Sequence, residues 1–350
     1  MAYTTIDKPS DYFNTKLYTG NGGTQAISGI GFAPNWVWIK RRDGSAFHVV
    51  TDSVRGATKQ IYPNDNQAEG TRAQGLQSFD SDGYTLGNEG DTNASSSTYV
   101  GWNWKAGTSF TNDASATGIG TIDSTGSASD TAGFSIVSYS GTGGAGTIKH
   151  GLSTAPSMII VKVRTGRTSD WLVYHKGIAS DAQTDCIKLN ETGAAFDEAT
   201  IWNDTAPTSS VFSVGTEDTV SGSGNTFIAY CFSEVKGYSK FGSYNGNSNA
   251  DGTFVYTGFK PAFVMVKMIN GADDWQILDN KRSPHNIVGG YLLPNSSSAT
   301  INNDVIDFTA TGFKLRKTFG SWNHSSYQYL YMAFAEESFV SSSGVPATAR

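Results

Sequence analysis

Histidine and cysteine are the side chains most often used to bind metal ions, and this sequence has few of them. It contains five histidines and two cysteines in 350 residues, none at the short intervals typical of zinc motifs. The histidines are therefore predicted to be ordinary loop or strand-end residues: His48, His150, His175, which aligns with Thr51 and Asp279, His285 and His324. Cys186 and Cys231 are too few for a disulfide framework and are predicted to be buried free thiols. No metal ion or other cofactor is expected.

Carboxylates beside aromatic residues form the second group that can do chemistry. They occur in Asp170-Trp171 and in Asp273-Asp274-Trp275. A pair of carboxylates can cleave a glycosidic bond, but the corresponding segment nearer the start, Ser45-Ala46-Phe47, contains no acid. These carboxylates are therefore predicted to be turn residues, and the protein is predicted to have no catalytic residue.

Three loops, two of which contain these carboxylates, carry aromatic and amide groups suited to sugars. Loops can vary without disturbing a core, and for that reason they often carry recognition. The candidate binding residues are Asp170, Trp171, Asp273, Asp274, Trp322, Asn323 and His324.

The elements that position these residues are repeated along the chain. An apolar strand led by a proline and ended by a lysine occurs at Pro34–Lys40, Pro156–Lys162 and Pro261–Lys267. Turns, strands and aromatic residues surround each copy in the same order, and such self-similarity marks a repeat architecture. The stem of each lysine is predicted to cover apolar surface while its ammonium group reaches water.

Composition and repetition together predict an all-β protein. Forty glycines and abundant aromatic residues favour short strands joined by turns. The expected architecture is three tandem antiparallel β-sandwich or jelly-roll-like repeats: residues 1–107 with an N-terminal arm, 134–235, and 236–340. Residues 108–133, rich in Ser, Thr and Gly, are predicted to be a linker or surface loop, and 341–350 a C-terminal tail.

Alternation along two strands predicts which side chains are buried. In the last strand of each unit, the bulkier face is expected to form the core of that unit; it includes Trp102, Trp104, Tyr230, Phe232, Met332 and Phe334. The proline-led strand is apolar on both faces, as in strands covered on both sides. Its second face is expected to be an assembly interface, covered by another repeat, a loop or another chain: Trp36, Trp38, Met158, Ile160, Phe263 and Met265.

Net charge and hydropathy exclude two classes of partner. The formal charge is −6 and the 25 Lys and Arg are scattered, whereas nucleic-acid binding needs concentrated positive charge. The sequence has no apolar run of 18 residues, so membrane insertion is not expected. The first residues lack an apolar signal core, which predicts a protein made in the cytoplasm and not exported by a signal peptide.

Four segments resemble a family of tailed-phage virion proteins that are abundant in phages of marine bacteria. They are residues 11–20, 32–40, 101–107 and 333–339, and the resemblance covers most of the chain. It implies a non-enzymatic, tail-fibre-like structural protein of the virion, assembled in the cytoplasm of the host bacterium, with other virion proteins as partners.

Several roles fit that resemblance. The first is a tail fibre or tail-associated protein for host attachment, with a host cell-surface glycan as a partner. By analogy with phage fibres, a homo-oligomer is expected, with a trimer favoured. The alternatives are a capsid decoration protein and a carbohydrate-degrading tail spike, the latter requiring paired carboxylates in a groove.

Overall fold

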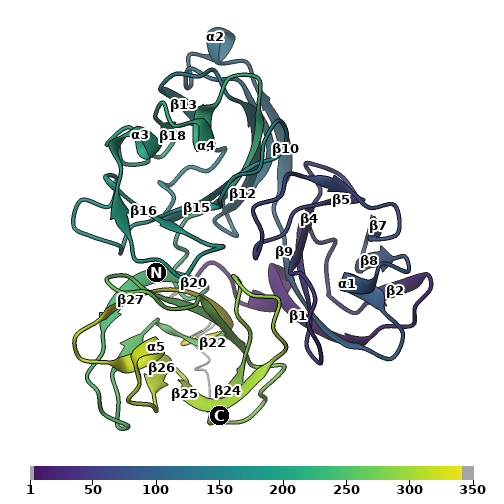
Figure 1. Ribbon diagram of the computed structural model, residues 1–350, viewed down its shortest axis with the longest axis vertical. Coiled ribbons are helices and arrows are strands. Elements are labelled where there is room, and N and C mark those ends of the chain that lie inside the picture. Colours follow the sequence, from purple (N-terminus) through teal and green to yellow (C-terminus); the bar gives the residue numbers. More distant parts are fainter. Residues whose placement is uncertain (1–3, 341–350) are drawn as a thin grey trace.

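The computed structural model describes residues 4–340 and shows an all-β protein made of three lobes (Figure 1). We call them lobe 1 (residues 13–104), lobe 2 (108–232) and lobe 3 (239–338). Each lobe consists of antiparallel sheets, and each α-helix of the described chain has four residues. The predicted all-β fold class is therefore correct. The predicted tail, 341–350, lies outside the described residues.

Each lobe contains an inner sheet that faces the other two lobes, and the three inner sheets share one strand order. Lobe 1 has the order β1 (Phe13–Thr19), β9 (Thr98–Trp104), β3 (Trp36–Arg41), β4 (Val49–Asp52). Lobe 2 has β12 (Phe134–Ser140), β19 (Thr226–Phe232), β14 (Met158–Val163), β15 (Leu172–His175). Lobe 3 has β20 (Ser239–Asn245), β27 (Gln328–Ser338), β22 (Phe259–Met268), β23 (Gln276–Asp279).

A smaller outer sheet covers the far side of each inner sheet. Its strands are β2 (Gln25–Ser28), β8 (Gly83–Leu86) and β7 (Leu76–Asp80) in lobe 1, and β13 (Gly146–Lys149) and β18 (Val211–Val214) in lobe 2. In lobe 3 they are β21 (Phe254–Tyr256), β26 (Gly312–Leu315), β25 (Ile301–Thr309) and β24 (Val288–Tyr291). One helical turn precedes the central strand of each inner sheet: α1 (Gly90–Asn93), α4 (Asp218–Ser221) and α5 (Gly320–Asn323).

Short elements complete the fold. A 3-10 turn, η1 (Pro9–Asp11), leads into β1. Lobe 1 adds the pair β5 (Lys59–Gln60) and β6 (Gly70–Thr71). Lobe 2 adds β16 (Asp185–Lys188), β17 (Phe196–Asp197) and α3 (Ala199–Trp202).

The segment predicted to be a linker or loop, 108–133, is folded. It contains β10 (Thr108–Asn112), α2 (Ala114–Thr117) and β11 (Ser124–Ser129). Strand β11 pairs with β12 over its whole length, so the hairpin extends the inner sheet of lobe 2 at its edge. The prediction was wrong because these strands lack apolar alternation, and their order depends on hydrogen bonds offered by β12.

The face assigned to the core of each unit points instead to the centre of the molecule. Trp36 lies directly opposite Trp104, and Trp38 opposite Trp102. Directly opposed residues share a face of the sheet, so Trp102 and Trp104 belong with the predicted interface and not with the interior of lobe 1. The interior of that lobe is built from the opposite face, where Tyr99 and Val37 pack with the outer sheet.

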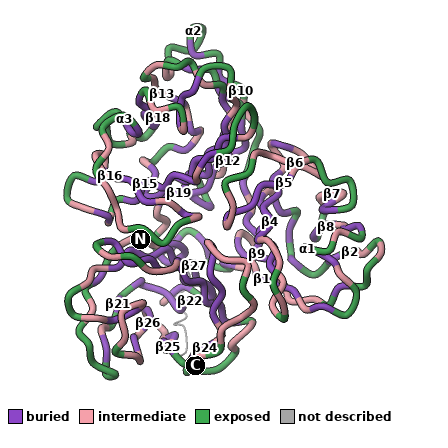
Figure 2. The backbone as a smooth tube through the Cα atoms, in the orientation of Figure 1, coloured by how far each residue is buried: buried purple, intermediate pink, exposed green. Residues whose placement is uncertain are grey.

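All the side chains in question are nevertheless buried, as predicted. Exposure does not exceed 1% for the six residues of the last strands or for the six of the proline-led strands. Rings from different lobes meet at the centre: the centroid distances are 4.7 Å for Trp36–Tyr230 and 5.2 Å for Phe13–Phe334. Figure 2 shows the buried segments gathered toward the middle of the molecule, with exposed turns at its periphery.

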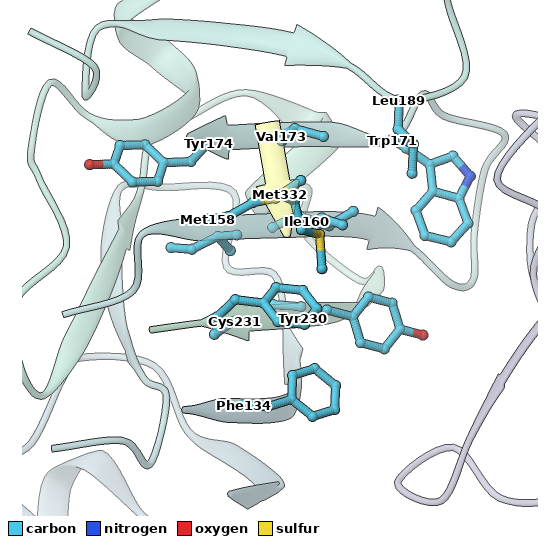
Figure 3. Close-up of a cluster of buried hydrophobic side chains, with 14 of the residues drawn as sticks. Phe134, Met158, Ile160, Trp171, Val173, Tyr174, Leu189, Tyr230, Cys231 and Met332 are labelled. Carbon is cyan, nitrogen blue, oxygen red and sulfur yellow. The ribbon is translucent and has the colours of Figure 1, made fainter. Parts of the chain in front are cut away.

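The predicted assembly interface is therefore covered by neighbouring lobes of the same chain. Figure 3 shows Met332 of lobe 3 among side chains of lobe 2 strands, including Met158, Ile160 and Tyr230, which belong to the same cluster. A second chain is not needed to cover this face. Cys186 and Cys231 are buried free thiols, as predicted.

Candidate functional site: the contacts between lobes

The three repeated lysines join the lobes in a closed ring. Each stands at or near the end of its inner-sheet strand and donates from Nζ to a backbone oxygen in another lobe. Lys40 of lobe 1 reaches Ser297 of lobe 3 at 2.9 Å. Lys162 of lobe 2 reaches Asn66 of lobe 1 at 3.0 Å, and Lys267 of lobe 3 reaches Thr192 of lobe 2 at 3.2 Å.

These ammonium groups do not reach water, contrary to the prediction. All three lysines are 0% exposed. Each also donates to an oxygen of its own lobe, at 3.0 Å to Arg41, 2.6 Å to Ser169 and 2.8 Å to Met268. Burial lowers the pKa of each lysine to about 8, because an ammonium ion loses its hydration in a protein interior.

A second set of equivalent residues connects the lobes at the end of the next strand. Asp52, His175 and Asp279 lie opposite Trp36, Met158 and Phe263 respectively. The sequence had indicated that His175 is equivalent to Thr51, but the strand pairing makes it equivalent to Asp52. The three residues bond to Tyr230 Oη at 2.7 Å, the backbone oxygen of Tyr331 at 3.1 Å and Trp102 Nε1 at 3.1 Å.

Two of these positions form buried ion pairs. Arg55 Nε lies 2.5 Å from Asp52 Oδ2, and Arg282 Nε lies 2.5 Å from Asp279 Oδ2. The same carboxylates accept backbone N–H groups at the start of the following turn. In lobe 2, burial lowers the pKa of His175 to about 4. The neutral ring accepts from the N–H of Gly177 at Nδ1 and donates from Nε2 to Tyr331.

The carboxylates beside Trp171 and Trp275 hold strand ends in place. Asn190 donates to Asp170 at 2.8 Å and accepts the N–H of Trp171. Asn295 does the same with Asp274, at 2.6 Å, and Trp275. Asp273 accepts from the hydroxyl of Ser321 at 2.8 Å. The structure thus gives each of these carboxylates a partner within the protein.

The two tryptophans themselves dock against neighbouring lobes. Trp171 is 1% exposed, and its Nε1 donates to Tyr62 O at 2.9 Å in lobe 1. Trp275 is 0% exposed and donates to Lys188 O at 2.8 Å in lobe 2. Trp171 was predicted to contact a ligand, but its ring is inaccessible.

Most of the third predicted binding loop is buried inside lobe 3. Trp322 and Asn323 are both 0% exposed. The amide nitrogen of Asn323 donates to three oxygens, in Asn247, Asn249 and Lys317. Asn93 makes the equivalent three bonds in lobe 1. Only His324 is partly accessible, where its ring lies beside Tyr327.

The structure therefore does not bring the predicted binding residues together at one surface. Asp170 and Trp171 lie at the junction of lobes 1 and 2, and Trp322 lies inside lobe 3. Within residues 4–340 there is no group of three or more His, Cys, Asp or Glu that could hold a metal ion. No helix of this described part is long and apolar enough to cross a membrane.

Sequence reasoning missed the exposed aromatic pair Phe254 and Tyr256 on β21. Their alternation with Val255 was present in the sequence, but exposure depends on whether anything covers the strand. The repeated lysines were noticed, and only their environment was wrongly predicted.

Fold and contacts define an all-β protein in which three two-sheet lobes close around a common apolar centre and are joined by buried polar contacts. The model of one family, described as "Domain of unknown function (DUF7483)", matches residues 8–338. The chain belongs to that family. A comparison with curated proteins found no match.

Proposed function

We propose that this protein is a non-enzymatic structural protein of a tailed-phage virion and acts in the tail as a host-attachment component. The virion assignment rests on the resemblance of residues 11–20, 32–40, 101–107 and 333–339. The structural role is supported by the ring of lysine contacts between lobes. Polar residues at the repeated positions form hydrogen bonds between the lobes of the chain. Such bonds suit a rigid protein that presents its peripheral turns to a partner.

The decisive experiment is to locate the protein in purified particles. Antibodies raised against the purified protein are expected to label the tail in immunogold electron microscopy. The purified protein, added before the phage, is expected to reduce adsorption to host cells. Absence of the protein from purified particles would overturn the virion assignment. Release of reducing sugar from host polysaccharide by the purified protein would overturn the non-enzymatic role and favour the tail spike.

One observation favours a capsid decoration protein as the second candidate. Three lobes with the same inner-sheet order surround one centre (Figure 1). Such an arrangement is suited to a local threefold axis of a capsid lattice. Immunogold label on the head, with unchanged adsorption in the competition assay, would select this role. A homo-oligomer in either setting must use a surface other than the central apolar face, because the lobes themselves cover that face.

A further inference from the structure

The outer sheet of lobe 3 carries two exposed aromatic rings on its edge strand. The exposed fractions of Phe254 and Tyr256 on β21 are 48% and 53%. Val255, between them, is buried in the core of lobe 3, so the alternation of the strand turns both rings outward. Strand β21 lies toward the periphery of lobe 3 (Figure 2). An exposed apolar pair on one face of a sheet can form part of a contact surface.

The other lobes show that the fold does not require these rings. Ile27, Ile148 and Val255 occupy equivalent places, since each lies opposite a buried aromatic residue of the neighbouring strand. The flanking residues are Ala26 and Ser28 in lobe 1, and Thr147 and Lys149 in lobe 2. In lobe 2, the N–H groups of Thr121 and Ile122 also bond to Thr147 O at 2.8 and 3.1 Å. The aromatic pair is thus particular to lobe 3.

Polar groups continue the same face beside the rings. Lys314 lies opposite Phe254, and Asp307 lies opposite Lys314. Directly opposed residues share a face, so the two charged side chains extend the row that Phe254 begins. Lys314 also pairs with Asp251. In the next row of the same face, Gly312 of β26 lies opposite Tyr256.

The charges on this face balance. Arg316 pairs with Asp307 at 2.6 Å and lies 3.9 Å from Asp251. With Lys314, the set contains two cations and two anions, so it offers neither excess charge to a polyanion nor an anionic site to a cation. A neutral ligand with many hydroxyl groups fits such a set, because hydroxyls can donate to carboxylates and accept from ammonium and guanidinium groups.

The size of the apolar patch argues against a protein partner. Half of an aromatic side chain is about 100 Å², so the two rings offer about 200 Å². A stable protein interface buries about 800 Å² on each side. An area of this size instead matches the C–H faces of one or two sugar rings.

We propose that the outer face of β21 and β26 binds a neutral glycan, with sugar rings stacked on Phe254 and Tyr256 and hydroxyl groups bonded to Lys314 and Asp307. A glycan site would supply the recognition that the proposed attachment role requires, and its biological purpose rests on that proposed role. The site differs from the loops at Asp170, Asp273 and Trp322 because Phe254 and Tyr256 are exposed, whereas Trp171 and Trp322 are buried.

The test is direct binding to the purified full chain. Isothermal titration calorimetry would use maltoheptaose, cellohexaose and mannohexaose as neutral probes and an alginate hexasaccharide as the anionic probe. At least one neutral probe is expected to bind and the alginate probe not to bind. The double variant Phe254→Ala/Tyr256→Ser introduces the residues found at the equivalent positions of lobe 1. It is expected to weaken binding by about tenfold or more. Phe254→Trp, which keeps a ring, is expected to retain it.

A matched control is Thr147→Ala/Lys149→Ser, at the equivalent place in lobe 2, and it is expected to bind as the unmodified protein does. The circular dichroism melting curve of each variant tests whether it is folded. Failure of every neutral probe to bind, equal binding of alginate, or binding unchanged in the double variant would overturn the proposal. Because the assay uses purified protein, its failure leaves the virion assignment untouched, and absence from particles leaves the binding result untouched.

Discussion

Lys40, Lys162 and Lys267 are held where an ammonium ion is costly, yet each bonds to backbone oxygens of two lobes. Such bonds give each ammonium group two acceptors, and within residues 4–340 no carboxylate forms an ion pair with any of the three lysines. The energetic consequence is a dependence of stability on pH. Each folded-state pKa is about 8, whereas a lysine in the unfolded chain titrates near 10.4.

Between about pH 8 and pH 10 the unfolded chain holds more protons at these lysines than the folded chain does. Stability contributed by them therefore rises with pH across this window, and the burial penalty is complete below it. Lys162→Met removes one of these ionisable groups and therefore its share of the pH dependence. Between pH 7.5 and 10, the free energy of unfolding of the unmodified protein is expected to rise by about 1–3 kcal/mol relative to that of Lys162→Met. Urea unfolding measures it, with the surface variant Lys8→Met as control; parallel pH curves for Lys162→Met and the unmodified protein would contradict the expectation.

At the scale of an element, the hairpin of β10 and β11 is an addition to the inner sheet of lobe 2. It depends on close backbone contact with β12, and Gly126 lies within that contact, opposite Val137. A Cβ added at Gly126 would lie 2.3 Å from the backbone oxygen of Ile136 and 2.8 Å from the ring of Phe110. A side chain at this position therefore cannot be accommodated unless β11 moves away from β12.

Gly126→Ala is expected to lower the free energy of unfolding by about 1–3 kcal/mol, as overpacking does. Hydrogen exchange should become faster in residues 108–129 and remain unchanged in lobes 1 and 3. Thr125→Ala, at the exposed neighbouring position, is the control and should exchange like the unmodified protein. If exchange rises equally in all three lobes, the hairpin does not open independently of them.

At the scale of the whole molecule, the shared centre makes the lobes depend on one another. Trp104 contacts Trp36 in its own lobe at a centroid distance of 4.4 Å, and Phe263 and Phe334 in lobe 3 at 5.6 Å. It is 1% exposed. Loss of this ring opens a cavity between lobes and exposes apolar surface of more than one lobe, so the damage cannot be confined to lobe 1.

Trp104→Ala is expected to cost about 3–5 kcal/mol of stability. Differential scanning calorimetry should show one transition that moves to lower temperature as a whole. Phe79→Ala, on the outer sheet of lobe 1 and only partly buried, should shift the transition less. A variant in which one transition moves while others stay would show that the lobes unfold separately.

Most strands could be predicted from the sequence, because alternation and turn residues are local properties. The strong burial of Trp36, Met158 and Phe263 was also predictable, since a strand that is apolar on both faces must be covered on both. The candidate binding site was not. Trp171 and Trp322 have the chemistry of a sugar contact, but a tryptophan is equally suited to a core, and only its neighbours decide between the two.

The sequence by itself determined the all-β class, the repeated strand order and the burial of the aromatic residues on the inner-sheet strands. Only the tertiary structure decided which face of each inner sheet points to the centre, because both faces are apolar and the pairing of Trp36 with Trp104 settles the matter. It also decided the environment of Lys162, whose ammonium group is buried because lobe 1 supplies the oxygen of Asn66. Such contacts join residues that are far apart along the chain, and no local pattern encodes them.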